Sequence, residues 1–82
     1  MGLKKLAEKV AEYNDRLKSG KVGKIKPGHV EKVLEKLRKK SAELEAEIAS
    51  AHSPEKRARL ERKLEVARAQ EKRAEWLLKE LG

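Results

Sequence analysis

The chain has 82 residues, of which 44% are charged and 2% aromatic, and its formal net charge is +8. A chain of this length forms one domain at most, and so small a domain buries only about 60% of the surface that its unfolded chain exposes. It has no cysteine, which excludes disulfides and thiolate metal sites, so its stability has to come from helix packing or from association with another chain.

The first predicted element is an amphipathic helix over residues 3–18. Its apolar residues recur at alternating spacings of three and four, which places them on one face of the helix. They are Leu3, Leu6, Val10, Tyr13 and Leu17. Ser19 and Gly20 are expected to end the helix, because glycine is the residue best suited to the left-handed conformation found at many helix ends.

A basic, glycine-rich loop is expected over residues 19–27, held to the bundle by Val22 and Ile25. Pro27 suits the first turn of a helix, where a missing N–H has no effect, and a second helix is predicted over residues 28–50. Its inward positions follow the four-three alternation of a heptad seam. They are Val30, Leu34, Leu37, Ser41, Leu44, Ile48 and Ala51, with Ser41 the single polar member.

The third predicted helix covers residues 54–81 and begins at Pro54, directly after Ser53 as its N-cap. The same repeat continues along it, with one acidic member. Its positions are Leu60, Leu64, Ala67, Glu71, Ala74, Leu78 and Leu81. Only residues 51–53 separate the second and third helices, and so short a connection makes them antiparallel neighbours.

The fold class is therefore all-α. The sequence predicts a coiled-coil-like antiparallel helical hairpin with the N-terminal helix packed on its open end, as a three-helix bundle in a single domain. Charges at the closed end are expected to support the pairing, with the acids of the second helix beside the arginines of the third. These are Glu43, Glu45 and Glu47 against Arg57, Arg59 and Arg62. Glu71 is expected to reach solvent, to pair with a lysine of the first helix or to specify register.

No combination of residues predicts catalysis, so we expect a protein that is not an enzyme and that binds no cofactor or metal. The only histidines, His29 and His52, lie at opposite ends of the second helix, on the order of 35 Å apart at 1.5 Å per residue. One chain therefore cannot bring both histidines to a shared metal site, and no combination of residues in the sequence predicts a nucleophile beside a base. No apolar stretch is long enough to span a bilayer and no signal peptide is recognisable, which favours a cytoplasmic protein.

The apolar residues outside the seams suggest the preferred function, that of a helical protein-interaction module that acts on a protein partner or on itself, with a homodimer as one form. They are Trp76, Val33, Val66 and Leu77. Trp76 points nearly opposite to the seam of its own helix. Either the first helix or its loop covers the indole, or Trp76 anchors a contact with another chain, as tryptophan often does at binding hot spots.

The alternative function is that of a small accessory protein that binds RNA or DNA backbone through non-specific phosphate contacts. Two basic stretches motivate it, one around the first loop and one within the second helix. They consist of Arg16, Lys18, Lys21, Lys24 and Lys26, and of Arg38, Lys39 and Lys40. Against it, the chain has no recognised nucleic-acid motif and no aromatic residues placed for base stacking. Other interpretations of the same positive charge are that it keeps the protein soluble, binds an acidic protein partner or binds an anionic lipid surface.

Overall fold

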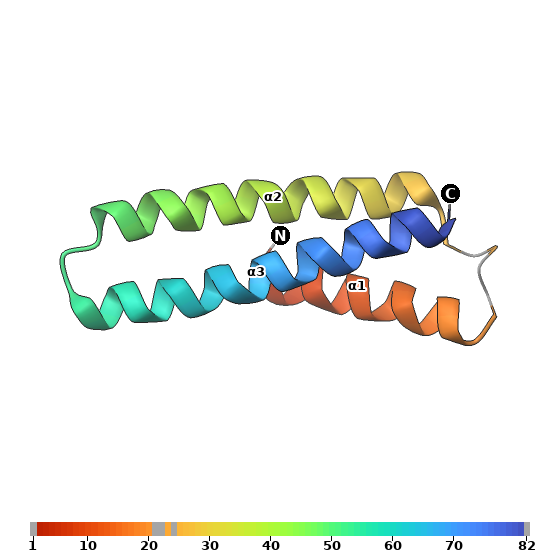
Figure 1. Ribbon diagram of the computed structural model, residues 1–82, viewed down its shortest axis with the longest axis horizontal. Helices are drawn as coiled ribbons and strands as arrows, with labels where there is room; N and C mark the ends of the chain where they lie inside the picture. The colour runs from red at the N-terminus through yellow and green to blue at the C-terminus, as the bar shows by residue number, and fades with distance from the viewer. Residues whose placement is uncertain (1, 21–22, 24, 82) are drawn as a thin grey trace.

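The computed structural model describes residues 2–20, 23 and 25–81. It contains three α-helices, α1 (Leu3–Lys18), α2 (Pro27–Ser50) and α3 (Pro54–Leu81), and no strand in the described residues. The helices α2 and α3 form a long antiparallel hairpin, and α1 packs beside its open end, running parallel to α3 (Figure 1). The molecule measures 47 × 19 × 18 Å. The predicted all-α three-helix bundle is confirmed.

The ends of the helices follow from local sequence. Gly20 has a positive φ of 77°, the conformation that glycine adopts without steric cost. The backbone N–H and the hydroxyl of Ser19 both donate to the carbonyl oxygen of Asp15, at 3.0 and 2.9 Å. Helix α2 begins at Pro27 rather than at residue 28 as predicted, with Lys26 as its N-cap. The fixed φ of proline explains this start, because it already suits the helix.

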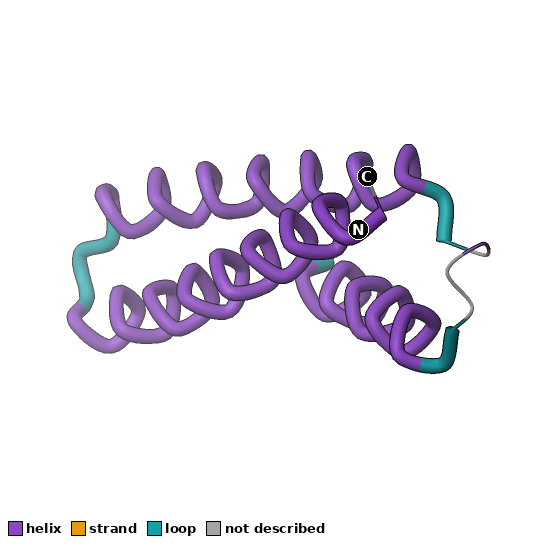
Figure 2. Tube along the Cα trace, turned by 45° about the vertical axis from the view of Figure 1, so that its right-hand side comes forward, coloured by secondary structure: helices purple, strands orange, loops and turns teal. Residues whose placement is uncertain are grey.

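The core is divided because α1 is shorter than the hairpin. With 16 residues against 24 in α2, α1 covers roughly 24 Å of a hairpin arm that is roughly 36 Å long, and both views show the closed end as α2 and α3 alone (Figures 1 and 2). The larger core cluster lies at the open end. It contains Leu6, Val10, Tyr13, Ile25, Val30, Val33, Leu34, Leu37, Ala74 and Leu77.

A smaller cluster holds the closed end of the hairpin together, and consists of Leu44, Ala51, Leu60 and Ala67. Leu3, at the start of α1, packs against both clusters. The predicted seams of α2 and α3 are therefore confirmed as the inner faces of the hairpin. Ile25 is buried in the larger cluster, as expected for a residue that holds the loop, whereas Val22 lies outside the described residues.

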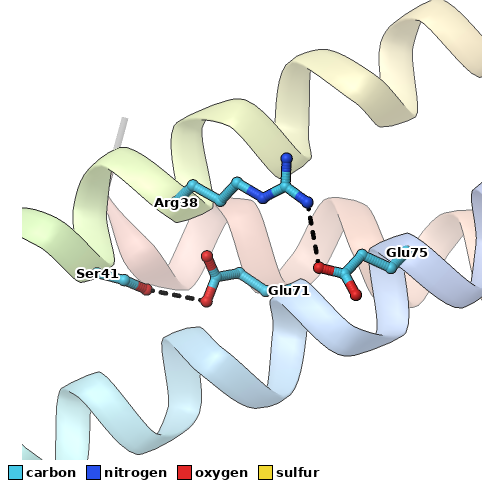
Figure 3. Close-up of polar contacts among 4 residues, drawn as sticks. All are labelled: Arg38, Ser41, Glu71 and Glu75. Carbon is cyan, nitrogen blue, oxygen red and sulfur yellow. Dashed lines mark hydrogen bonds and ion pairs between the residues drawn. The ribbon is translucent and has the colours of Figure 1, made fainter.

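The polar members of the two seams meet each other. The hydroxyl of Ser41 donates to a carboxylate oxygen of Glu71 at 3.1 Å (Figure 3). Ser41 is only 7% exposed, while Glu71 is half-buried at the edge of the seam. Of the three roles considered for Glu71, this contact fits the specification of register, because a one-turn shift would place each polar group against an apolar neighbour.

The ion pairs across the hairpin differ from those predicted at its closed end. Within the described residues, α2 and α3 are joined by Arg38–Glu75 at 3.2 Å and by Arg68–Glu45. The register that places Ser41 beside Glu71 also places Glu45 beside Arg68, further from the closed end than the predicted arginines. Arg57 instead donates to the backbone carbonyl of Ala51 at 3.2 Å. The ion pairs among the described residues therefore do not join the predicted acids to the predicted arginines, and Glu45 pairs with Arg68 instead.

Leu37 is fully buried in the larger cluster. We expect Leu37→Ala to lower the free energy of unfolding by about 2–5 kcal/mol, because it removes buried apolar contact and leaves a cavity. Val66→Ala is the matched control. Its side chain is 47% exposed, so a change of no more than about 0.5 kcal/mol is expected. Urea unfolding followed by circular dichroism measures both, and equal effects would contradict the assigned core.

A double-mutant cycle tests the Ser41–Glu71 contact. Ser41→Ala and Glu71→Ala are combined, because alanine at either position removes the hydrogen bond. We expect a coupling energy of about 1 kcal/mol from unfolding curves, the size typical of a hydrogen bond to a partly buried group. The same cycle with Ser41→Ala and Glu80→Ala should show coupling near zero, because Glu80 is exposed and far from Ser41 on α3. Additivity in the first cycle would rule out this contact as a determinant of register.

Candidate protein-interaction surface around Trp76

Trp76 lies in an open groove between α1 and α3. The groove has a volume of about 460 Å³ and is lined by Asn14, Lys18, Ala69, Lys72, Arg73 and Trp76. The indole is 46% exposed, although tryptophan is highly buried on average in folded proteins. Helix α1 therefore approaches Trp76 but does not cover it. The sequence had left two interpretations open, an indole covered by the first helix and an indole that contacts another chain, and the observed exposure lies between them.

The exposure of Trp76 follows from how α3 is seated. Ala74 and Leu77 are both fully buried against the other helices. Because neighbouring helix positions are separated by about 100°, these two residues turn position 76 toward the outer side of α3. A large apolar side chain is thereby held at the surface by its own helix, and α1 contributes only the edge of the groove.

Two of the predicted interaction residues serve the core instead. Val33 is 4% exposed and Leu77 is fully buried, and both belong to the cluster that α1 closes. Their apolar area is already covered within the chain, so these two residues are not available to contact a partner. The sequence pattern could not separate them from Trp76, because all three lie outside the heptad seams.

Val66 and Trp76 share one exposed stripe on α3. They are the exposed large apolar side chains of the described residues, and Ala69 and Arg73 lie between them at successive spacings of three, four and three. This spacing keeps the four residues on one helix face, over a length of roughly 15 Å. We call this stripe, Val66–Ala69–Arg73–Trp76, the outer seam of α3.

The groove beside the outer seam is positively charged. Lys18, Lys72 and Arg73 line it without any carboxylate among the lining residues. None of these three cations forms an ion pair within the described part of the chain. The groove between α2 and α3 differs, because there Glu45, Glu71 and Glu75 accompany the basic side chains.

The basic stretch around the first loop is divided among different environments. Arg16 pairs with Glu12 and its guanidinium lies 6.0 Å from the centroid of the Tyr13 ring. Lys18 faces the Trp76 groove, and Lys26 is exposed at the start of α2. The remaining two lysines, Lys21 and Lys24, lie outside the described residues.

The second basic stretch, within α2, is largely occupied by acidic partners. Arg38 pairs with Glu75 (Figure 3), and Lys40 lies 4.0 Å from a carboxylate oxygen of Glu43. Lys39 is exposed and lies roughly 20 Å along the helix from Lys26. The fold therefore does not join the two basic stretches into one continuous surface among the described residues.

Sequence reasoning did not identify Asn14, Ala69, Lys72 and Arg73 as part of a site. The spacing from Val66 to Trp76 was a usable signal for Ala69 and Arg73, since it is visible in the sequence as a second stripe on the same helix. The contribution of Asn14 required the tertiary structure, because it depends on where α1 lies relative to α3.

No protein-family model matches the sequence, and no curated protein or solved structure shows significant similarity to it. In the described part of the chain, no cluster of histidine, aspartate and glutamate side chains is arranged to hold a metal ion. None of its described helices is long and apolar enough to cross a membrane. The function has to be inferred from the geometry of the surface.

The charge around Trp76 can be measured directly, because it is the only tryptophan in the chain. Quenching by each ion is expressed relative to its quenching of free N-acetyltryptophanamide. On this scale we expect iodide to quench the fluorescence of Trp76 more strongly than caesium at equal ionic strength, because Lys18, Lys72 and Arg73 concentrate anions near the indole. Substituting all three with glutamine should reduce the difference, whereas Lys39→Gln, away from the groove, should leave it unchanged. Equal relative quenching by the two ions in the unmodified protein would contradict the assigned electrostatics.

Proposed function

We propose that this protein is a non-enzymatic helical interaction module that binds a protein partner through the outer seam of α3 and the adjoining groove. The observation that carries the proposal is the exposure of Trp76, which is 46%, on a helix whose other large apolar side chains mostly face the core. Burying such an indole at an interface is strongly favourable, and tryptophan is enriched among the residues that dominate binding energy.

The shape and charge of the surface support a role in binding. Val66 and Trp76 offer apolar contacts, and Lys18, Lys72 and Arg73 form a charged rim around the second of them. An apolar centre with a polar rim is the usual arrangement of protein interfaces. These side chains stand on backbone that is already helical in the free protein, so a partner does not have to order that backbone when it binds.

Catalysis is not part of this proposal. His29 and His52 are both exposed; His29 lies in the first turn of α2, and His52 lies in the connection that follows its other end. The groove beside Trp76 contains cations and an amide but no nucleophile beside a base, which is the arrangement that covalent catalysis requires. Its side chains are suited to binding an anionic group and an apolar one together.

Binding of nucleic-acid backbone is the competing function, and Lys18 is the residue that favours it, because it belongs to the basic stretch around the first loop and also lines the groove. Arg16, Arg38 and Lys40 are less suited to phosphate binding, since each has a carboxylate within ion-pair distance. A protein partner makes use of both exposed apolar residues, whereas a phosphate backbone makes use of neither.

Site-specific photo-crosslinking tests the proposed function. Glu65 is exposed on α3 next to the outer seam, and is replaced by p-benzoylphenylalanine in the cells that make the protein. We expect a crosslinked product that is resistant to nuclease, sensitive to protease, and reduced by adding Trp76→Ala. The same amino acid at Ala46, which is exposed on α2, is the matched control and should give no such product.

Three results would contradict the proposal. These are no product from position 65, products of equal yield from positions 65 and 46, and a product that nuclease removes. The last would support the nucleic-acid function instead. Circular dichroism of the Trp76→Ala variant serves as the folding control, because a half-exposed side chain contributes little to the core.

A further inference from the structure

We infer that the partner segment is an acidic amphipathic α-helix of another protein, laid along the outer seam of α3 beside α1. This inference rests on the proposed function and names the chemistry of the partner at the same surface.

The spacing favours a helical partner. Val66, Ala69, Arg73 and Trp76 alternate at three and four residues, which is the pattern by which one helix presents a row of side chains to another. Val66 and Trp76 stand at the two ends of the row, with the methyl group of Ala69 between them. A small residue flanked by larger ones forms a hole into which a side chain of a neighbouring helix fits, with the two helix axes about 8–10 Å apart.

The charge favours an acidic partner. Lys18, Lys72 and Arg73 converge on the groove with no carboxylate among its lining residues. Charged residues that flank a helix–helix seam select the partner, and like charges placed opposite one another disfavour binding. A helix with leucines in its seam and glutamates along its flanks satisfies both the apolar and the cationic side chains of this surface.

The same charge argues against a second copy of this chain as the occupant. A twofold contact along the outer seam would centre near residue 71 if Val66 of each copy met Trp76 of the other. Lys72 and Arg73 of both copies would then lie close together at the centre of the contact, where water is excluded and repulsion between cations is strongest. The overall net charge of +8 adds to this repulsion.

A single-stranded nucleic acid fits the surface less well. Such strands are bound by several aromatic side chains on which successive bases stack. This chain has one tryptophan, one tyrosine and no phenylalanine, and Tyr13 is buried in the core at 8% exposure. Trp76 would stack with one base, while Val66 would contribute no contact suited to the strand.

Synthetic helices provide the test, with the fluorescence of Trp76 and the anisotropy of labelled peptides as readouts. The first peptide carries leucine at its seam positions and glutamate at its flanks; the second has lysine in place of glutamate; the third is a scrambled version of the first. We expect the first to bind one to one, with a blue shift of the Trp76 emission, and at least about tenfold more tightly than the other two at low salt. Single-stranded oligothymidylate is the anionic comparison and should bind more weakly than the first peptide.

Charge reversal makes the test specific to the groove. The variant with Lys72→Glu and Arg73→Glu should lose its preference for the acidic helix and bind the lysine peptide better than the unmodified protein does. Lys39→Glu with Lys32→Glu, exposed positions on α2, is the matched control and should keep the original preference. Both variants change only exposed side chains, so circular dichroism should show intact bundles.

The outcomes separate this inference from the proposed function. Equal binding of the acidic, basic and scrambled peptides, tighter binding of the oligonucleotide, or a self-association in sedimentation that buries Trp76 would each overturn the acidic-helix partner. The proposed function would still stand if position 65 crosslinked to protein. Absence of a protein crosslink at position 65, whatever the peptides do, would instead remove the proposed function itself.

Discussion

The packing of α2 against α3 in one fixed register is the constraint on which the rest of the structure depends. Two heptad seams supply the apolar contacts, but leucine-rich seams tolerate shifts by a turn, because one leucine can replace another. The hydrogen bond between Ser41 and Glu71 adds a contact that only one register satisfies. The ion pairs Arg38–Glu75 and Arg68–Glu45 lie on either side of it and agree with the same alignment.

That register determines what α1 can cover. With α2 and α3 aligned, Val33 and Leu77 belong to one core cluster at the open end of the hairpin, together with Leu6, Val10 and Tyr13 from the apolar face of α1. Beyond the start of α1 the hairpin continues as two helices, held by the smaller cluster around Leu44 and Ala67. A helix as short as α1 is sufficient, because the apolar residues of the hairpin that need to be covered are concentrated at its open end.

The exposed surface around Trp76 follows from the way in which α3 packs against the other two helices. Once Ala74 and Leu77 are turned inward, helix geometry turns Trp76 outward, and α1 lies too far to one side to bury it. The groove beside Trp76 is also positively charged, because α1 contributes Lys18 and α3 contributes Lys72 and Arg73. The surface therefore combines an exposed apolar side chain with cations from two helices, and the proposed binding of a partner rests on this combination.

The sequence by itself determined the three helices, their limits to within a residue, and the inner faces of the hairpin, because helix periodicity and end signals at Gly20 and Pro27 are local properties. It also determined that Trp76 points away from its own seam. Only the tertiary structure decided which of the extra apolar residues stay exposed: Val33 and Leu77 are covered by α1, whereas Val66 and Trp76 are not. The charge pairs were likewise decided by register, which depends on contacts between residues far apart in the chain and has no local signature. For the same reason, the placement of Lys18 beside Trp76 could not be predicted, since it requires the position of one helix relative to another.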